Sequence, residues 1–290
     1  MLVMAELTGE SRYEIVIERS TGWLKIPWHE LWDYRDLLYL LVQRDFISRY
    51  KQTILGPVWH LIQPLLTTVV FVIFARAARI PTDSIPAPLF YLCGLLVWNY
   101  FNQNITAGGA TFVNNSHLFG KVYFPRLIVP ISVVIANLVA VALQAIPFVL
   151  VLGYYKFFTH ALDEMHLTWL ILLFPLPLLQ TCLLSLGIGL WMSAATAKFR
   201  DLVHLNQYIV QIWMFATPVL YPLSIVPERW RWLNWANPAS VPVEAFRLCL
   251  FGQGSLEPHE IVFSSLITVF LLLTGIALFQ RVERTVIDIV

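Results

Sequence analysis

The side chains that could carry out catalysis are few and scattered along the chain. Asp163, Glu164 and His166 form a cluster of acids with a histidine. At a membrane edge, such a cluster could transfer protons in an enzyme that acts on lipid-linked substrates. All three lie in a short predicted loop, so we interpret them as solvated loop charges. The three cysteines are far apart and show no CxxC spacing, and we predict neither a catalytic residue nor a metal site.

A phosphate-binding loop is also missing from the sequence. The pair Gly120-Lys121 is followed by Val122, and the position five residues before Gly120 holds Asn115 rather than glycine. The glycine-rich pattern that cradles nucleotide phosphates is therefore not met. If this chain moves a substrate uphill, the energy must come from another polypeptide.

The composition places the chain in a membrane. Of its 290 residues, 58% are hydrophobic and 13% are charged, whereas soluble domains carry about 25% charged residues. So few charges cannot cover a water-facing surface of this size, which excludes a soluble globular protein. The same figures exclude intrinsic disorder, collagen-like repeats and disulfide scaffolds. The net charge of +1 gives no field that would attract nucleic acid, so we expect no nucleic-acid partner.

Six apolar stretches are long enough to cross a bilayer, which takes about 20 residues. Because backbone groups in lipid must bond within their own segment, we expect helices, and the alternation typical of a membrane barrel is not seen. The second and fifth stretches carry Asn, Gln or Pro near an end. No core contains a charged residue, so an ion or proton relay is not expected. The predicted spans are about 54–75, 87–106, 127–152, 167–195, 203–222 and 261–280.

The flanking charges predict the orientation and the division of the chain. The segments on the same side of the membrane as the N-terminus hold about twice as many lysines and arginines as the loops on the opposite side. This bias predicts a multi-pass protein of the cytoplasmic (inner) membrane with both termini in the cytoplasm. Residues 1–27 form a polar cytoplasmic extension with a short strand at 13–18, residues 54–280 form the membrane domain, and residues 281–290 form a cytoplasmic tail.

Residues 28–53 are predicted to form an amphipathic helix that lies among the lipid headgroups. Arg35 and Leu37 break its pattern, but its tryptophans gather at one end, as is typical of interfacial helices. A soluble helix packed on a partner is the alternative. The predicted apolar face comprises Trp28, Leu31, Trp32, Leu38, Val42, Phe46 and Tyr50.

Three stretches carry a more specific pattern than generic membrane sequence. They are residues 44–64 (RDFISRYKQTILGPVWHLIQP), residues 114–130 (NNSHLFGKVYFPRLIVP), and residues 199–201 (FRD) continued by 217–227 (TPVLYPLSIVP) and 237–247 (NPASVPVEAFR). In order and spacing they resemble the permease subunit of the ABC-2 type exporters of cell-surface polysaccharides, which include O-antigen, capsule and teichoic acid exporters. The resemblance runs from about Trp32 to the C-terminus, and the 1–27 extension is longer than the pattern requires.

This resemblance implies an all-α integral membrane protein with six transmembrane helices behind an N-terminal amphipathic interfacial helix, in the ABC-2, type V exporter-like fold. It implies pairing with a second copy of the chain and with two nucleotide-binding ATPase subunits. A lipid-linked polysaccharide would cross through a channel at the permease dimer interface, surrounded by membrane lipids. ATP and Mg would bind to the partner ATPase and no cofactor to this chain, which agrees with the missing phosphate-binding loop.

The predicted cytoplasmic loop that begins at Asn114 is the candidate contact with the ATPase. A helix capped by Asn or Ser and ended by Pro125 would make a short rigid lever, and an ordinary turn is the alternative. The candidate coupling residues are Asn114, Asn115, Ser116, His117, Phe119, Lys121, Tyr123, Phe124, Arg200 and Asp201. The candidate residues of the interfacial or gate helix are Arg44, Arg49, Tyr50 and Lys51.

Aromatic side chains in the predicted spans offer flat faces on which sugar rings can stack. The candidates for the channel lining are Trp59, Tyr91, Trp98, Tyr100, Trp213 and Phe215; lipid-facing bulk and interfacial belts are the alternative. The predicted external segment 222–260 is too long for a turn, and its pieces 232–243 and 248–256 could form re-entrant or interfacial half-helices. Its candidate exit residues are Trp230, Trp232 and Trp235, with an anchor on the outer leaflet as the alternative.

Three functions are compatible with these features. The first is the permease half of an ATP-driven exporter of a lipid-linked, O-antigen-like polysaccharide. The second is an ABC-2 permease for a lipid or drug, and residues 122–126 and 218–227 favour the glycan branch by resemblance. The third is a membrane-embedded transferase acting on lipid-linked sugars, which would need a catalytic cluster facing the membrane edge that the sequence lacks.

Overall fold

A computed structural model describes residues 28–51, 53–119, 124–159 and 169–287, and every regular element in these ranges is a helix. The predicted 1–27 extension with its strand, and the acid–histidine cluster at 163–166, lie outside the described residues. In chain order the helices are α1 (Trp28–Asp33), α2 (Arg35–Tyr50), η1 (Gly56–Val58), α3 (Trp59–Ala78), α4 (Ala87–Gly109), α5 (Thr111–Asn114), α6 (Ser116–Phe119), α7 (Ile128–Phe158), η2 (Trp169–Leu173), α8 (Pro175–Lys198), α9 (Leu202–Phe215), η3 (Leu223–Ile225), α10 (Glu228–Ala236), α11 (Ser240–Phe251) and α12 (Pro258–Ile287).

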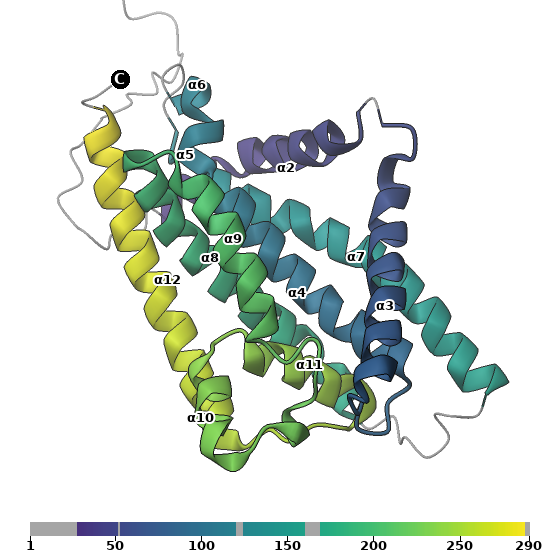
Figure 1. Ribbon diagram of the computed structural model, residues 1–290. Helices are drawn as coiled ribbons and strands as arrows, with labels where there is room; N and C mark the ends of the chain where they lie inside the picture. The colour runs from purple at the N-terminus through teal and green to yellow at the C-terminus, as the bar shows by residue number, and fades with distance from the viewer. Residues whose placement is uncertain (1–27, 52, 120–123, 160–168, 288–290) are drawn as a thin grey trace, which may run out of the picture.

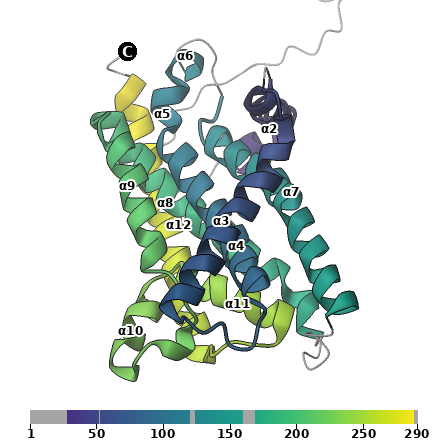
Figure 2. The same ribbon diagram turned by 45° about the vertical axis from the view of Figure 1, so that its right-hand side comes forward.

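The long helices form a bundle in which the chain runs back and forth between two ends (Figures 1 and 2). Helices α3, α7 and α9 run in one direction, and α4, α8 and α12 run in the other. We call one end the terminal end, because it holds both α2 and the last turns of α12, together with α5, α6 and the turn between α8 and α9. The opposite end holds α10 and α11, and we call it the hairpin end.

Four helical stretches of the described chain are long and apolar enough to cross a membrane: Gly56–Ala78, Ile128–Phe158, Leu170–Lys198 and Pro258–Glu283. They match the predicted first, third, fourth and sixth spans. The predicted second span is α4, whose middle is polar. The predicted fifth span, 203–222, is shorter than expected, because α9 ends at Phe215 and a turn with Pro218 follows.

Helix α4 tolerates its polar middle because other helices surround it. Asn99 donates from Nδ2 to Gln144 Oε1 on α7 over 3.2 Å. Asn104 donates to Ser185 Oγ on α8 over 2.9 Å, and its own Oδ1 accepts from Asn137 of α7 over 2.7 Å. In an interior without water each of these amides needs a protein partner, and α7 and α8 supply them. Helix α4 is therefore the centre of the bundle.

Glycines allow the helices around this centre to approach closely. A Cβ added at Gly187 of α8 would lie 2.8 Å from the Leu272 backbone nitrogen of α12, and one at Gly275 would lie 2.5 Å from the Gly187 carbonyl oxygen. Between α4 and α8, a Cβ at Gly108 would lie 3.5 Å from the Gly189 Cα. Small residues at such crossings are typical of membrane helix pairs, where close packing replaces the hydrophobic effect.

The outer faces of the bundle are apolar. Large exposed hydrophobic side chains cover them, and such a surface suits lipid or another membrane subunit rather than water. Examples are Leu66, Val70 and Ile73 on α3, Leu150 and Phe157 on α7, Tyr208 and Ile212 on α9, and Leu266 and Phe270 on α12.

The α8–α12 contact predicts that Gly275→Ala destabilises the chain by about 1–3 kcal/mol, because the added methyl group overlaps the Gly187 carbonyl. Thermal unfolding of the purified chain in detergent measures this loss. Gly153→Ala on α7 is the matched control, because its Cβ would meet nothing within 4 Å and alanine favours a helix over glycine. The control should keep or raise the unfolding midpoint, and equal midpoints for the two variants would contradict the close contact.

Candidate functional site

The terminal end begins with the helix that was predicted to lie among the headgroups. It is broken at Tyr34 into α1 and α2. Leu41 is buried with Leu37 and Leu38 beside it, against Phe124, Ile128 and Val129 at the start of α7. Leu37, which breaks the predicted pattern, therefore belongs to the packed face, whereas Trp32, assigned to the apolar face, is 71% exposed. The helix packs on its own chain along one face, which keeps Leu31 and Leu38 of the predicted apolar face and adds Leu37 and Leu41.

An aromatic stack joins the remaining elements of the terminal end. The rings of Phe112 (α5) and Phe279 (α12) are stacked with centroids 4.7 Å apart. Phe119 (α6) lies 5.7 Å from Phe112 and 6.0 Å from Phe124. The Arg126 guanidinium covers the Phe119 ring at 5.1 Å and donates to the backbone carbonyl of Glu283 over 3.2 Å. The two short helices α5 and α6, which together we call the step, are therefore fixed to the start of α7 and to the end of α12.

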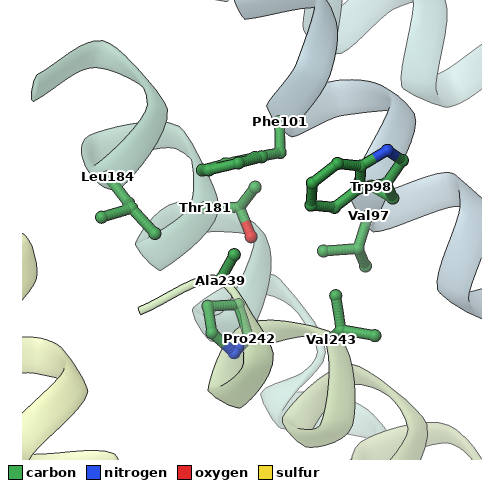
Figure 3. A pocket seen from close by; sticks show the side chains of 8 residues that line it. All are labelled: Val97, Trp98, Phe101, Thr181, Leu184, Ala239, Pro242 and Val243. Atoms are coloured by element: carbon green, nitrogen blue, oxygen red, sulfur yellow. The ribbon is translucent and has the colours of Figure 1, made fainter. Parts of the chain in front are cut away.

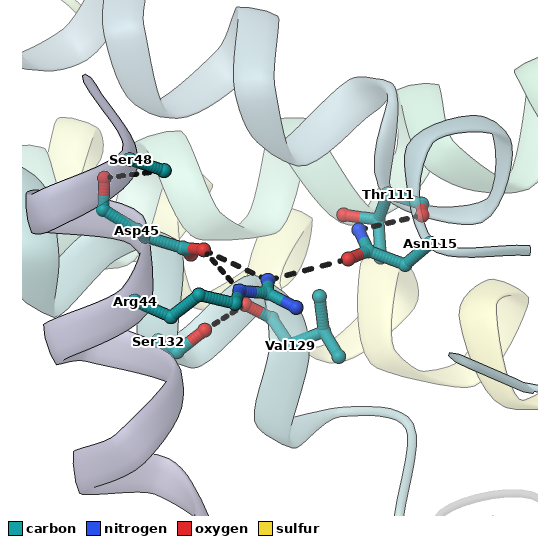
Figure 4. Close-up of polar contacts among 7 residues, drawn as sticks. All are labelled: Arg44, Asp45, Ser48, Thr111, Asn115, Val129 and Ser132. Carbon is teal, nitrogen blue, oxygen red and sulfur yellow. Dashed lines mark hydrogen bonds and ion pairs between the residues drawn. The ribbon is translucent and has the colours of Figure 1, made fainter. Parts of the chain in front are cut away.

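A polar contact connects α2 to the same step (Figure 4). The Arg44 guanidinium donates to Asp45 Oδ1 over 2.8 Å and to Asn115 Oδ1 over 3.4 Å. Asn115 donates in turn from Nδ2 to the Thr111 carbonyl over 3.1 Å. The structure thus brings together two predicted site residues, Arg44 and Asn115, that are 71 positions apart in the sequence.

The lever helix predicted from residue 114 to residue 124 is divided at Asn115 within the described residues, and residues 120–123 lie outside them. Helix α5 begins at Thr111, before the predicted start, and Asn115 separates it from α6. Asn115, one of the predicted capping residues, ends α5 and directly precedes α6, and its amide donates to the Thr111 carbonyl of α5. Neighbouring side chains hold both short helices in place.

The predicted coupling and gate residues differ in exposure. Phe119 and Phe124, expected to be apolar contacts of a partner, pack within the chain because the aromatic stack covers them. Arg49 is half-buried. The exposed members are Arg44, Lys51, Asn114, Ser116, Arg200 and Asp201. The side chains of Tyr50 and His117, and the whole of Lys121 and Tyr123, lie outside the described residues.

Half of the predicted channel aromatics are buried in the subunit. The Tyr91 hydroxyl donates to the Leu220 carbonyl and the Tyr100 hydroxyl to the Val134 carbonyl, both over 3.3 Å. Trp98 packs 5.3 Å from Phe101. Figure 3 shows the small space beside these two rings, lined also by α8 and α11, which has no room for a water molecule. These three rings lie on the central helix α4, so protein covers them in this conformation.

The other predicted channel aromatics lie nearer the surface. Trp213 is half-buried, and its indole nitrogen donates to Asn237 Oδ1 over 2.8 Å while Phe101 meets its ring edge-on at 5.4 Å. Trp59 at the start of α3 is 51% exposed and Phe215 at the end of α9 is 60% exposed. Of the six predicted rings, Trp59 and Phe215 are the two that present a largely open face.

The hairpin end holds two short helices where half-helices were predicted, but their bounds differ. The first predicted piece, 232–243, covers the end of α10 and the start of α11. The second predicted piece, 248–256, is helical only as far as Phe251, where α11 ends. Trp230 and Trp232 are 46% and 50% exposed, whereas the side chain of Trp235 lies outside the described residues. Helix α11 is covered by α4 and α8 rather than lying on the surface.

A buried ion pair fixes α11, and the sequence reasoning missed it by assigning Arg247 to an external loop. Arg247 is 1% exposed and donates to Glu244 over 3.3 Å. It also donates to the carbonyls of Pro218 and, over 3.1 Å, Val219, and its guanidinium lies 3.7 Å from the centre of the Phe90 ring. Burial raises the pKa of the Glu244 carboxyl, and the Arg247 charge opposes that shift. The spacing of three residues between acid and base in an apolar segment was the available signal.

The terminal end combines an exposed polar surface with packed aromatic rings. Polar residues on α5, on α6 and on the α8–α9 turn are exposed, and the rings of Phe112, Phe119 and Phe279 pack together. Within the described ranges, no three His, Cys, Asp or Glu side chains come close enough to hold a metal ion.

The family is decided by the match of residues 36–251 to the model of the ABC-2 type transporter membrane family. The chain belongs to this family. The match runs from α2 to the end of α11, so it includes the terminal end, the central helix and the hairpin end. The resemblance stated from residues 44–64, 114–130 and 199–247 is confirmed, and the chain is a multi-pass membrane permease.

Characterised relatives share most of this length. The O-antigen export system permease protein RfbA of Myxococcus xanthus is 36% identical over 200 residues, which cover 69% of this chain and 73% of the relative. A protein of the same description from Klebsiella pneumoniae is 25% identical, with 86% and 92% covered. The polysialic acid transport protein KpsM of Escherichia coli is 25% identical, with 85% and 93% covered.

The buried ion pair predicts that Arg247→Ala destabilises the permease by about 3–5 kcal/mol, because the Glu244 carboxylate would remain buried without its partner. Thermal unfolding in detergent measures the effect. The double variant Arg247→Met with Glu244→Leu removes both charges and should recover most of the loss. A single variant as stable as the parent chain would show that the pair is not shielded from water.

Proposed function

We propose that the chain is the permease subunit of an ATP-driven exporter that moves a lipid-linked, O-antigen-like surface polysaccharide across the cytoplasmic membrane. The observation that carries this proposal is the alignment of the chain, over most of its length, with proteins described as O-antigen and polysialic acid transporters. The three stretches that distinguish the polysaccharide branch in the sequence point to the same class of cargo.

The proposed assembly contains a second copy of the chain and two nucleotide-binding ATPase subunits. The sequence has no phosphate-binding loop, so ATP and Mg would bind to the ATPase subunits. The exposed apolar face of α9 (Leu205, Tyr208, Ile209, Ile212 and Phe215) offers a surface for a second copy or for the channel between two copies.

The proposed topology has six spans, with α4 and α9 added to the four that are long and apolar enough by themselves. Helix α4 has 23 residues, about 34 Å at the rise of a helix, which matches a hydrocarbon core of about 30 Å. The alternating directions of the six helices bring both described ends of the chain to the terminal end. In this proposal the terminal end is cytoplasmic, α1 and α2 lie at the inner membrane surface within residues 28–53, residues 54–280 form the membrane domain, and residues 281–290 form the tail.

The proposed contact with the ATPase is the exposed polar ridge of the terminal end. Asn114 and Ser116 on the step, and Arg200 and Asp201 on the α8–α9 turn, are open to a partner. Arg44 braces the step from α2. Because the step rests on the aromatic stack, a push on these residues would move the bundle rather than bend a loop.

A cross-link tests this contact. Cysteine in place of Asn114 should cross-link to the co-expressed ATPase, because the side chain is exposed on the ridge. Cysteine in place of Phe158, which is 76% exposed at the far end of α7, is the matched control and should give no product. The measurement is a shifted band on a denaturing gel, and equal yields from both positions would contradict the proposed orientation.

The open aromatics test the path of the glycan. Trp59→Ala and Phe215→Ala should lower ATP-dependent glycan export in reconstituted vesicles by about tenfold, the size expected from losing one ring stacked on a sugar, without lowering the amount of protein. Tyr91→Ala should instead lower the amount of folded protein, because that ring fills the core. Export at the parental rate with both surface rings removed would exclude them from the path.

A further inference from the structure

The joint between α4 and α5 consists of Gly108, Gly109, Ala110 and Thr111. Helix α4 ends at Gly109 and α5 begins at Thr111, so Ala110 alone separates the central helix from the step. The last carbonyls of a helix have no partner within it and must be satisfied by other groups. The Thr111 hydroxyl donates to the Gly108 carbonyl over 2.6 Å, which satisfies one of them from the joint itself.

Two side chains from other helices bond this joint and the turn of α4 just before it. The Thr196 hydroxyl of α8 lies 2.6 Å from the Gly109 carbonyl and 3.1 Å from the Ser193 carbonyl, and its single proton favours the shorter contact. Asn206 of α9 donates from Nδ2 to the Ile105 carbonyl over 3.2 Å. Both side chains are buried, at 0% and 2% exposure, so water does not replace these bonds when they break.

The fit around Gly109 leaves no space for a side chain. A Cβ at that position would lie 2.8 Å from Asn206 Nδ2 and 3.0 Å from the Met192 Cβ. The backbone of the joint therefore lies directly against the Asn206 amide on one side and against α8 on the other. This close approach is a second observation, independent of the hydrogen bonds, that the joint is seated between α8 and α9.

Thr196 and Asn206 lie on either side of the α8–α9 turn. Thr196 precedes Arg200 by four residues and Asn206 follows Asp201 by five. The two exposed surfaces of the terminal end, residues 114–116 on the step and residues 200–201 on the turn, are far apart in sequence. The joint is where hydrogen bonds from both sides of the turn reach the end of the central helix.

We infer that Thr196 and Asn206 are positioning residues that lock the α4–α5 joint to the α8–α9 turn, so that both surfaces and the central helix move as one body. The inference rests on the proposed function, in which a partner ATPase presses on these surfaces. A displacement at either surface then reaches α4 without being lost in bending at Ala110. With the lock removed, the ATPase would still dock and hydrolyse ATP, but less of its movement would reach the membrane domain.

The direct test measures the lock without any ATPase. Spin labels are placed at exposed Asn114 and Arg200 of the full chain in lipid nanodiscs, and the distribution of distances between them is recorded. The parent chain should give one narrow distribution, which Thr196→Val and Asn206→Leu should broaden. Thr196→Ser keeps the hydroxyl and should stay narrow. Thr181→Val is the matched control. It removes a buried hydroxyl of the same helix, α8, that donates to the Pro177 carbonyl one turn earlier in that helix. A broad distribution in the parent chain would overturn the inference.

The functional test uses the reconstituted complex with its ATPase. Thr196→Val and Asn206→Leu should leave the ATPase bound and hydrolysing ATP, while the glycan exported for each ATP consumed falls about fivefold, as expected for the loss of one buried hydrogen bond from a coupling network. Thr196→Ser and Thr181→Val should keep the parental ratio. An unchanged ratio in both lock variants, or an equal fall in Thr181→Val, would overturn the inference.

The two tests separate this inference from the proposed function. If the parent complex exports no glycan, the proposed function fails, and the spin-label distances still decide whether the joint is locked. If either lock variant does not fold, Gly109→Ala supplies a second way to disturb the joint, because its methyl group would push against the Asn206 amide. This variant should broaden the distances, and a narrow distribution would overturn the inference.

Discussion

The need to pair every polar group of the central helix determines the arrangement of this permease. Asn104 of α4 is buried and Asn99 is half-buried, and their partners are Gln144, Asn137 and Ser185 on two other helices. An amide without a partner in such an interior is costly, so α7 and α8 have little freedom in how they pack against α4. The outer helices then follow: α12 packs on α8 through glycines, and α3 and α9 cover the remaining sides.

The same dependence reaches both ends of the bundle. At the terminal end, the rings of Phe112, Phe119 and Phe279 join the step after α4 to α12, and Arg44 joins it to α2. At the hairpin end, α11 packs on α4 through the buried pair of Glu244 and Arg247. Each end of the molecule is thus attached to the central helix by contacts from distant parts of the sequence.

The sequence predicted the helical class, four of the long apolar helices and the family, because span length and absence of charge are local properties. It did not predict which aromatic rings are covered. Tyr91 and Phe215 are both aromatic residues within predicted spans, but Tyr91 is buried by neighbouring helices and Phe215 is exposed. The packing of Leu37 against α7 and the separation of α5 from α6 have the same origin, because tertiary contacts override local periodicity. Arg247 was missed because a charge near an aromatic loop is usually solvated, whereas here Pro218 and Val219 supply free carbonyls beside it.

That arginine constrains how the hairpin end can change shape. Arg247 is held at once by the carbonyls of the turn after α9, by Glu244 on its own helix and by the ring of Phe90 on α4. Separating α11 from α4 would leave a cation in an apolar gap, which costs far more than sliding apolar side chains past each other. If the chain carries the proposed polysaccharide, an opening at this end would have to be made by tilting α4, α11 and that turn together as a rigid block.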